Sequence, residues 1–372
     1  MSARTLGPLL VAALVAAIGV GFGAPVRSDD LPALPGPAPR VRAAAHDPAT
    51  ENARCEACHT DEAGEWRGSL HQEAWTDPVF QKAYAIEPVA FCRGCHAPES
   101  DPGAAPTEAA QGVGVGCTTC HVQGDSIVGP RTLAASDDHH AVRGDERLST
   151  QQACASCHQF DFPRSKGQPM QDTVSEHAGS TMSAVGCRDC HMPLVDGADG
   201  ARRRSHDFSV ISNPRLLEQA VAVEAARDGA MALSLELSAG RVGHAFPTGD
   251  MFRRLEVRAE ALDAEGKVVM TAPVVHLARK FRDIPASDGS LEIRRVEIAD
   301  TRVPPPGKGS RTVSVRFPAS TDRLSVRWVV AYQRMDHAMA ASFDVEQARD
   351  EIVVARGLIP PLALKPQSKE KP

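Results

Sequence analysis

All ten cysteines of the chain occur in pairs within one repeated motif, Cys-X-X-Cys-His. Cysteines at i and i+3 and a histidine at i+4 lie on one face of a helical turn. Two thioether bonds can then hold the edge of a porphyrin while the imidazole binds its iron. Disulfides and zinc knuckles also use paired cysteines, but neither requires histidine after every second cysteine. We therefore predict five covalently bound haem c groups, attached through Cys55 and Cys58, Cys92 and Cys95, Cys117 and Cys120, Cys154 and Cys157, and Cys187 and Cys190.

The histidine that ends each motif is the predicted iron ligand on one side of its haem. These ligands are His59, His96, His121, His158 and His191. Nine further histidines remain for the opposite sides, and most of them cluster in the same part of the chain. Imidazole is the usual second ligand of a low-potential haem iron. We predict that the distal iron ligands are His71, one of the neighbours His139 and His140, His177, His206 and His244.

The other histidines and the methionines are weaker candidates for distal ligands. His46, His276 and His337 are interpreted as surface or packing residues. A thioether is the alternative to imidazole, and Met170 and Met182 could supply it, although methionine more often fills gaps in a core.

The predicted pentahaem domain spans residues 43–207, which hold every cysteine and eleven of the fourteen histidines. So few residues per haem cannot build a separate apolar core around each one. We therefore expect the haems to pack against one another. The interval between the second and third motifs is the shortest, which predicts that these two haems are direct neighbours.

Residues 208–358 have no cysteine and show strict alternation of apolar and polar side chains instead. Leu233, Leu235 and Leu237 form one such run, and similar runs follow further along the chain. Alternation places one set of side chains on a core face and the other in water. We predict a mainly α-helical and irregular multihaem cytochrome c domain, followed by an antiparallel β-sandwich domain.

The two ends of the chain are not expected to pack into either domain. Arg4 and the apolar run 6–24 predict an N-terminal signal peptide or, if it is retained, a membrane anchor within residues 1–24. A proline-rich linker is predicted for residues 25–42 and a disordered tail for residues 359–372. The body of the protein is thus expected in the periplasm or at the extracellular face.

Segments around the motifs resemble a known family. EWRGSLHQEAWTDPVFQKA (65–83), ACASCHQFD (153–161), MQDT (170–173) and GCRDCHMP (186–193) are similar to segments of the multihaem cytochromes related to hydroxylamine oxidoreductase and its tetrahaem electron acceptor. GHAFPTGD (243–250) resembles a loop that joins such a haem region to a β-rich domain. The resemblance implies that His71, His206 and His244 are distal ligands. Many relatives have tryptophan after the glutamate where this chain has Glu176-His177, a departure from the pattern.

The expected function is electron transfer between protein partners, either other cytochromes or a membrane quinol-linked complex. The net charge of −6 argues against nucleic acid as a partner. The alternative is an oxidoreductase that acts on a small nitrogen or sulfur compound at an open haem iron. No lysine replaces a motif histidine, and only Tyr84 and Tyr332 could crosslink a haem, which favours the carrier over the enzyme. Self-assembly into a conduit through the β-domain is a third possibility.

Overall fold

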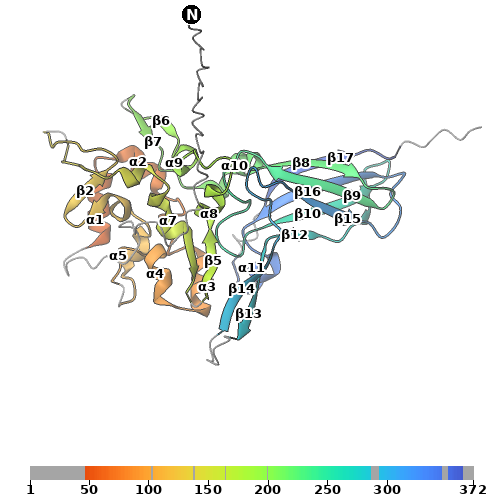
Figure 1. The fold of residues 1–372 in the computed structure, drawn as a ribbon, viewed down its shortest axis with the longest axis horizontal. Helices are drawn as coiled ribbons and strands as arrows, with labels where there is room; N and C mark the ends of the chain where they lie inside the picture. Colours follow the sequence, from red (N-terminus) through yellow and green to blue (C-terminus); the bar gives the residue numbers. More distant parts are fainter. Residues whose placement is uncertain are drawn as a thin grey trace, which may run out of the picture.

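The computed structural model describes residues 47–101, 104–136, 139–163, 165–198, 200–285, 293–345 and 351–362. Figure 1 shows a region of short helices beside a region of long strands, and the chain passes from the first to the second near α10 (Pro214–Gln219). Within the described ranges, no helix is both long and apolar enough to cross a membrane. The predicted leader (1–24) and linker (25–42) lie outside the described residues.

The helices of the first region are short, and the haem motifs are built into them. Asp47 caps the first helix by accepting the amide N–H of Thr50, and Asp77 and Thr107 cap two later helices in the same way. Four of the helices end at a motif histidine. The helices are α1 (Pro48–Glu56), α2 (Thr60–Trp66), α3 (Pro78–Ile86), α4 (Ala90–His96), α5 (Glu108–Val113), α6 (Cys117–His121), α7 (Gln152–His158), α8 (Thr173–Ala178) and α9 (Cys187–His191), with 3₁₀ turns η2 (Glu146–Ser149) and η3 (Val210–Ser212).

The haem region also has three small sheets, which the sequence did not predict. Most of their strands are too short to show a periodic pattern, and the longer ones are half-exposed and polar. The strands are β1 (Val122–Gln123), β2 (Ser126–Gly129) and β3 (Arg143–Gly144) in one sheet, β4 (Gln159–Phe162) and β5 (Ser165–Asp172) in another, and β6 (Leu194–Asp196) and β7 (Arg202–Arg204) in the third.

The second region has two larger antiparallel sheets. One consists of β15 (Ser310–Arg316), β9 (Ala232–Ala239) and β8 (Val221–Arg227), in that order. The other runs β11 (Val268–Thr271), β10 (Arg254–Leu262), β16 (Ser325–Gln333) and β17 (Glu351–Ile359), and β12 (Val275–Leu277) also pairs with β10. The short helix α11 (His337–Ser342) follows β16.

The predicted alternation matches the burial of the strands. Leu233, Leu235 and Leu237 in β9 are almost completely buried, whereas Glu236 between them is exposed. Side chains of both sheets belong to one hydrophobic core, in which β9 meets β10 and β16. Helices followed by antiparallel sheets thus agree with the predicted order of elements, and a sandwich arrangement of the sheets stays a prediction.

A hairpin of β13 (Arg279–Pro285) and β14 (Ile293–Asp300) leaves the strand region and lies beside β5 of the haem region (Figure 1). The Arg295 amide donates to Ser165 Oγ, and the Glu297 amide donates to Gln168 Oε1. The hairpin therefore joins the two regions through its backbone.

The C-terminal strand extends further than expected. Ile359, the first residue of the predicted tail, is the last residue of β17, and the Leu362 amide donates to Asp322 O. The residues after 362 lie outside the described part of the chain.

Candidate haem-binding site

Four motif histidines each face a second histidine from a distant part of the chain. The distances between ring centroids lie within a narrow range of one another. The pairs are His59–His140 at 6.1 Å, His71–His158 at 6.4 Å, His121–His206 at 6.3 Å and His191–His244 at 6.2 Å.

This spacing fits an iron atom between the two imidazoles. Metal–imidazole nitrogen bonds of about 2 Å, plus about 1 Å from each nitrogen to its ring centre, separate the centroids by roughly 6 Å. Direct stacking of two rings would bring them closer, as for His96 and Phe80 at 3.5 Å. The residues of this chain thus fit haem c on two counts, since thiols and paired imidazoles lie together at each of the four positions.

Hydrogen bonds orient several of these rings. Nδ1 of His121 donates to Val128 O, Nδ1 of His206 to Arg204 O, and Nδ1 of His244 to Ala245 O. A carbonyl only accepts, so Nδ1 carries the proton and Nε2 remains free to bind iron. This is the arrangement that metal-binding histidines commonly adopt.

Burial favours the neutral form that a metal requires for five of these imidazoles. It lowers the pKa of His71 to about 3 and the pKa values of His158 and His244 to about 4. Burial likewise lowers the pKa of His191 and His206 below the ordinary range. Charged histidine rings are therefore disfavoured in this region at neutral pH.

The structure distinguishes the neighbours His139 and His140, which the sequence could not. The ring of His140 faces His59, whereas His139 forms a backbone bridge with Ser136; both side chains are exposed. The geometry therefore favours His140 as the distal ligand at the first motif.

His96 of the second motif differs from the other four. Phe80 lies parallel to its ring at an angle of 7°, and Nδ1 bonds Ala74 O. Among the described residues, no histidine ring faces it as in the four pairs. The expectation of five histidine pairs for five irons is thus not met at this motif.

His177 also departs from the expected arrangement. Its side chain is buried, and its Nδ1 has no hydrogen-bond partner among the described residues. It lies near the His191–His244 pair and packs on Gly243, where an added Cβ would be 2.8 Å from its ring. The structure therefore places His177 beside the fifth motif rather than opposite His96, and its role as a ligand stays a prediction.

Thiols of different motifs contact one another, and these contacts order the motifs in space. Cys55 lies close to Cys117, Cys95 to Cys157, and Cys154 to Cys187. Cys120 of the third motif also lies near the fourth. The contacts thus join the second motif to the fourth. Thr119 of the third motif also donates to Glu99, which follows the second motif, at 2.9 Å. The expected adjacency of the second and third haems stays a prediction.

Asn52 of α1 positions the third motif. Its Oδ1 accepts the Cys117 amide at 2.8 Å, which satisfies a free N–H at the start of α6. Gly116 is needed for this approach, because a Cβ there would be 2.7 Å from Asn52 Oδ1. Asn52 is one of the residues that the sequence analysis missed.

Glu65 positions His206. One carboxylate oxygen accepts the His206 amide at 2.7 Å, and both oxygens accept from Arg203 at 2.8 and 3.0 Å. Burial alone would raise the pKa of Glu65, but these donors hold it below its usual range. Glu65 belongs to the EWRGSLH segment, although nothing in the sequence linked it to His206, far along the chain.

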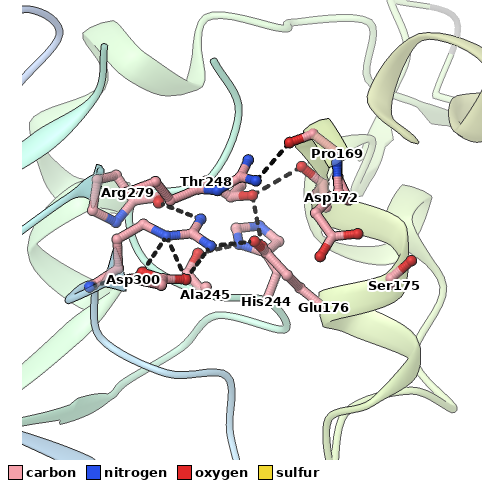
Figure 2. Close-up of polar contacts among 12 residues, drawn as sticks. Pro169, Asp172, Ser175, Glu176, His244, Ala245, Thr248, Arg279 and Asp300 are labelled. Atoms are coloured by element: carbon pink, nitrogen blue, oxygen red, sulfur yellow. Dashed lines mark hydrogen bonds and ion pairs between the residues drawn. The ribbon is translucent and has the colours of Figure 1, made fainter. Parts of the chain in front are cut away.

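His244 comes from the strand region and reaches the fifth motif of the haem region. Its ring lies nearly parallel to His191, at 14°. Figure 2 shows the loop of His244 and Thr248 beside α8, with Glu176 and Asp300 close by. Buried ion pairs and hydrogen bonds join the two sides here.

Comparisons with known proteins agree with this chemistry. Residues 54–122 match the family model described as cytochrome c554 and c-prime. The fold is similar to the crystal structure of a penta-heme cytochrome c552 from Thermochromatium tepidum, with a TM-score of 0.63 and 21% identity over 84% of this chain and 98% of the other. Both findings support a multihaem c-type cytochrome. No curated protein matches this chain.

Proposed function

We propose that the protein carries electrons through five covalently bound haem c groups. The observation that carries this proposal is the set of four histidine pairs, each spaced for an iron. Haem c supplies a reversible one-electron iron couple, and two imidazoles per iron leave no room for substrate and hold the potential low. The chain's own part is to fix these imidazoles and exclude water around them.

The thiol contacts support a route for the electrons. They join the first motif to the third and place the second, third and fifth motifs around the fourth. The fourth motif is therefore the junction of the proposed array.

The proposal is tested by counting the haems and by determining their spin states. Mass spectrometry of the denatured holoprotein should give five haems per chain, and four or fewer would contradict the count. Low-temperature electron paramagnetic resonance of the oxidised protein should be dominated by low-spin irons. A strong thioether-to-iron absorption band would contradict ligation by histidine pairs.

A second function is favoured by one observation, the absence of a facing histidine at His96 within the described residues. An iron held there by His96 alone would have one position free for a small nitrogen or sulfur compound. This function predicts one high-spin iron whose signal shifts when nitrite, hydroxylamine or sulfite is added. A spectrum with low-spin irons only would exclude it.

We also propose that the protein works outside the cytoplasm with redox proteins as partners. The apolar run 6–24 and the covalent haem motifs support this location. Mass spectrometry of the mature N-terminus, after cell fractionation, distinguishes a cleaved signal from a retained anchor. A chain found in the cytoplasm with Met1 at its N-terminus would contradict both the cleaved signal and the retained anchor.

A further inference from the structure

Two oppositely charged side chains are buried where the strand region meets the haem region. Arg302 precedes β15, and Glu176 lies in α8. Nη2 of Arg302 donates to Glu176 Oε1 at 2.6 Å, and only 6% and 7% of the two side chains are exposed. Arg302 also donates to Asp300 through Nε and Nη2. The guanidinium therefore pairs with two carboxylates, of which that of Glu176 is buried.

Both partners also hold the loop that carries His244. Nη1 of Arg302 donates to Pro247 O at 3.0 Å, and Thr248 Oγ1 donates to Glu176 Oε2 at 2.7 Å. The hydroxyl oxygen of Thr248 is in turn 2.9 Å from Thr173 Oγ1 of the haem region. Two consecutive loop residues are thus fixed by one ion pair, close to the imidazole that faces His191.

Stability alone does not explain a buried pair of this kind. Well-packed apolar residues of similar volume are often as stable as a buried ion pair, or more so. A guanidinium differs in that its planar set of donors meets several acceptors at fixed directions. Such support is what a metal ligand on a loop requires, because a mobile loop loses entropy when its histidine binds.

We propose that Arg302 and Glu176 are positioning residues that hold His244 opposite His191. Docking of the strand region and completion of the fifth haem site are then one event. This inference rests on the proposed ligation of haem iron by His244. Arg302 and Glu176 act on the iron only through the loop.

The test replaces the ion pair by apolar side chains in the full-length holoprotein, as Arg302→Met with Glu176→Leu. We expect five haems per chain, as before, and the conversion of one iron in five from low spin to high spin. Arg302→Lys keeps the charge but not the forked geometry, and should show a partial conversion.

Arg279 provides a matched control. It is a second buried arginine that crosses the same boundary, where it donates to Pro169 O at 2.6 Å and Met170 O at 2.9 Å. It does not contact the loop 244–250 in any hydrogen bond among the described residues. Arg279→Met should loosen the boundary to proteases and leave all spin states unchanged.

The outcomes separate the inference from the function on which it rests. If His244→Ala leaves the spin state of every iron unchanged, His244 is not an iron ligand. If His244→Ala creates a high-spin iron and the Arg302 and Glu176 double variant does not, only the positioning role is wrong. Should that double variant fail to fold, Thr248→Val removes a single hydroxyl. It should then let cyanide replace one histidine several-fold faster than in the Arg279 control, and an equal rate would overturn the proposal.

Discussion

The strand region has a continuous hydrophobic core between residues 217 and 354, whereas the buried apolar side chains of the haem region are scattered among its short helices. Residues 42–207 also carry 24 acidic and only 14 basic side chains. Side chains thus fill the interior of the strand region, and we expect haem to fill much of the interior of the other. The difference indicates that haem attachment and folding are coupled in the first region only.

The largest difference between the two regions is expected when the protein is made without haem. In a host without haem attachment machinery, we expect trypsin to digest residues 47–207 and to leave a resistant fragment of about 208–359. The strand region survives because its core is complete without cofactor. The holoprotein digested in parallel is the control. Protection of both regions in the haem-free chain would show that the haems are not the core of the first.

Removal of the fourth haem should have the next largest effect. Cys154→Ser with Cys157→Ser takes away the motif whose thiols contact the second and fifth. Rapid reduction should then proceed in separate fast and slow phases, because the remaining haems are divided.

Cys187→Ser with Cys190→Ser is the matched control for this junction. Among the described residues, Cys187 of the fifth motif lies close to Cys154 of the fourth, at the end of the proposed array, so its loss should leave a single phase. Identical kinetics in the two variants would contradict a junction at the fourth motif.

A cavity in the strand core should affect that region alone. Leu235 is fully buried in β9, and Leu235→Ala should lower the free energy of unfolding by about 2–5 kcal/mol. Leu358→Ala, at a side chain that is 61% exposed, should change it by less than about 0.5 kcal/mol. Urea unfolding followed by circular dichroism measures both. If the haem absorption of Leu235→Ala changed over the same urea range as its circular dichroism, the two regions would unfold as one.

The smallest effect should come from Glu65→Gln, which weakens charge-assisted hydrogen bonds to the His206 amide and Arg203 by about 1–3 kcal/mol. Hydrogen exchange should become faster at residues 203–207. Glu62→Gln is the matched control, because Glu62 is 3.8 Å from Arg203 and its loss should change little. Equal exchange rates in both variants would remove Glu65 from the residues that position His206.

Two kinds of sequence pattern can be interpreted without knowledge of the fold. The Cys-X-X-Cys-His motifs carry their chemistry within five residues, and the alternation around Leu235 follows directly from the geometry of a strand. Contacts between distant residues were not accessible in the same way. His139 and His140 are chemically identical in sequence, and only the fold shows which ring faces His59.

The contacts that the sequence did not predict have the same physical origin. Five candidate histidines suggested five pairs, but the structure places His177 near His244, and its role as a ligand stays a prediction. The hairpin of β13 and β14 was missed as an inter-region contact because its backbone bonds to Ser165 and Gln168 leave no trace in composition. Contacts between residues that are far apart in the sequence depend on how the chain folds back, and local periodicity does not predict them.

The origin of His244 has a consequence for the order of assembly. In three of the four pairs both histidines come from residues 59–206, so a chain that emerges N-terminus first can complete them before its strands exist. The pair of His191 must wait for His244, and therefore for the strand region to fold. The His191–His244 pair is thus expected to form last, and only in a molecule whose strand region has folded correctly.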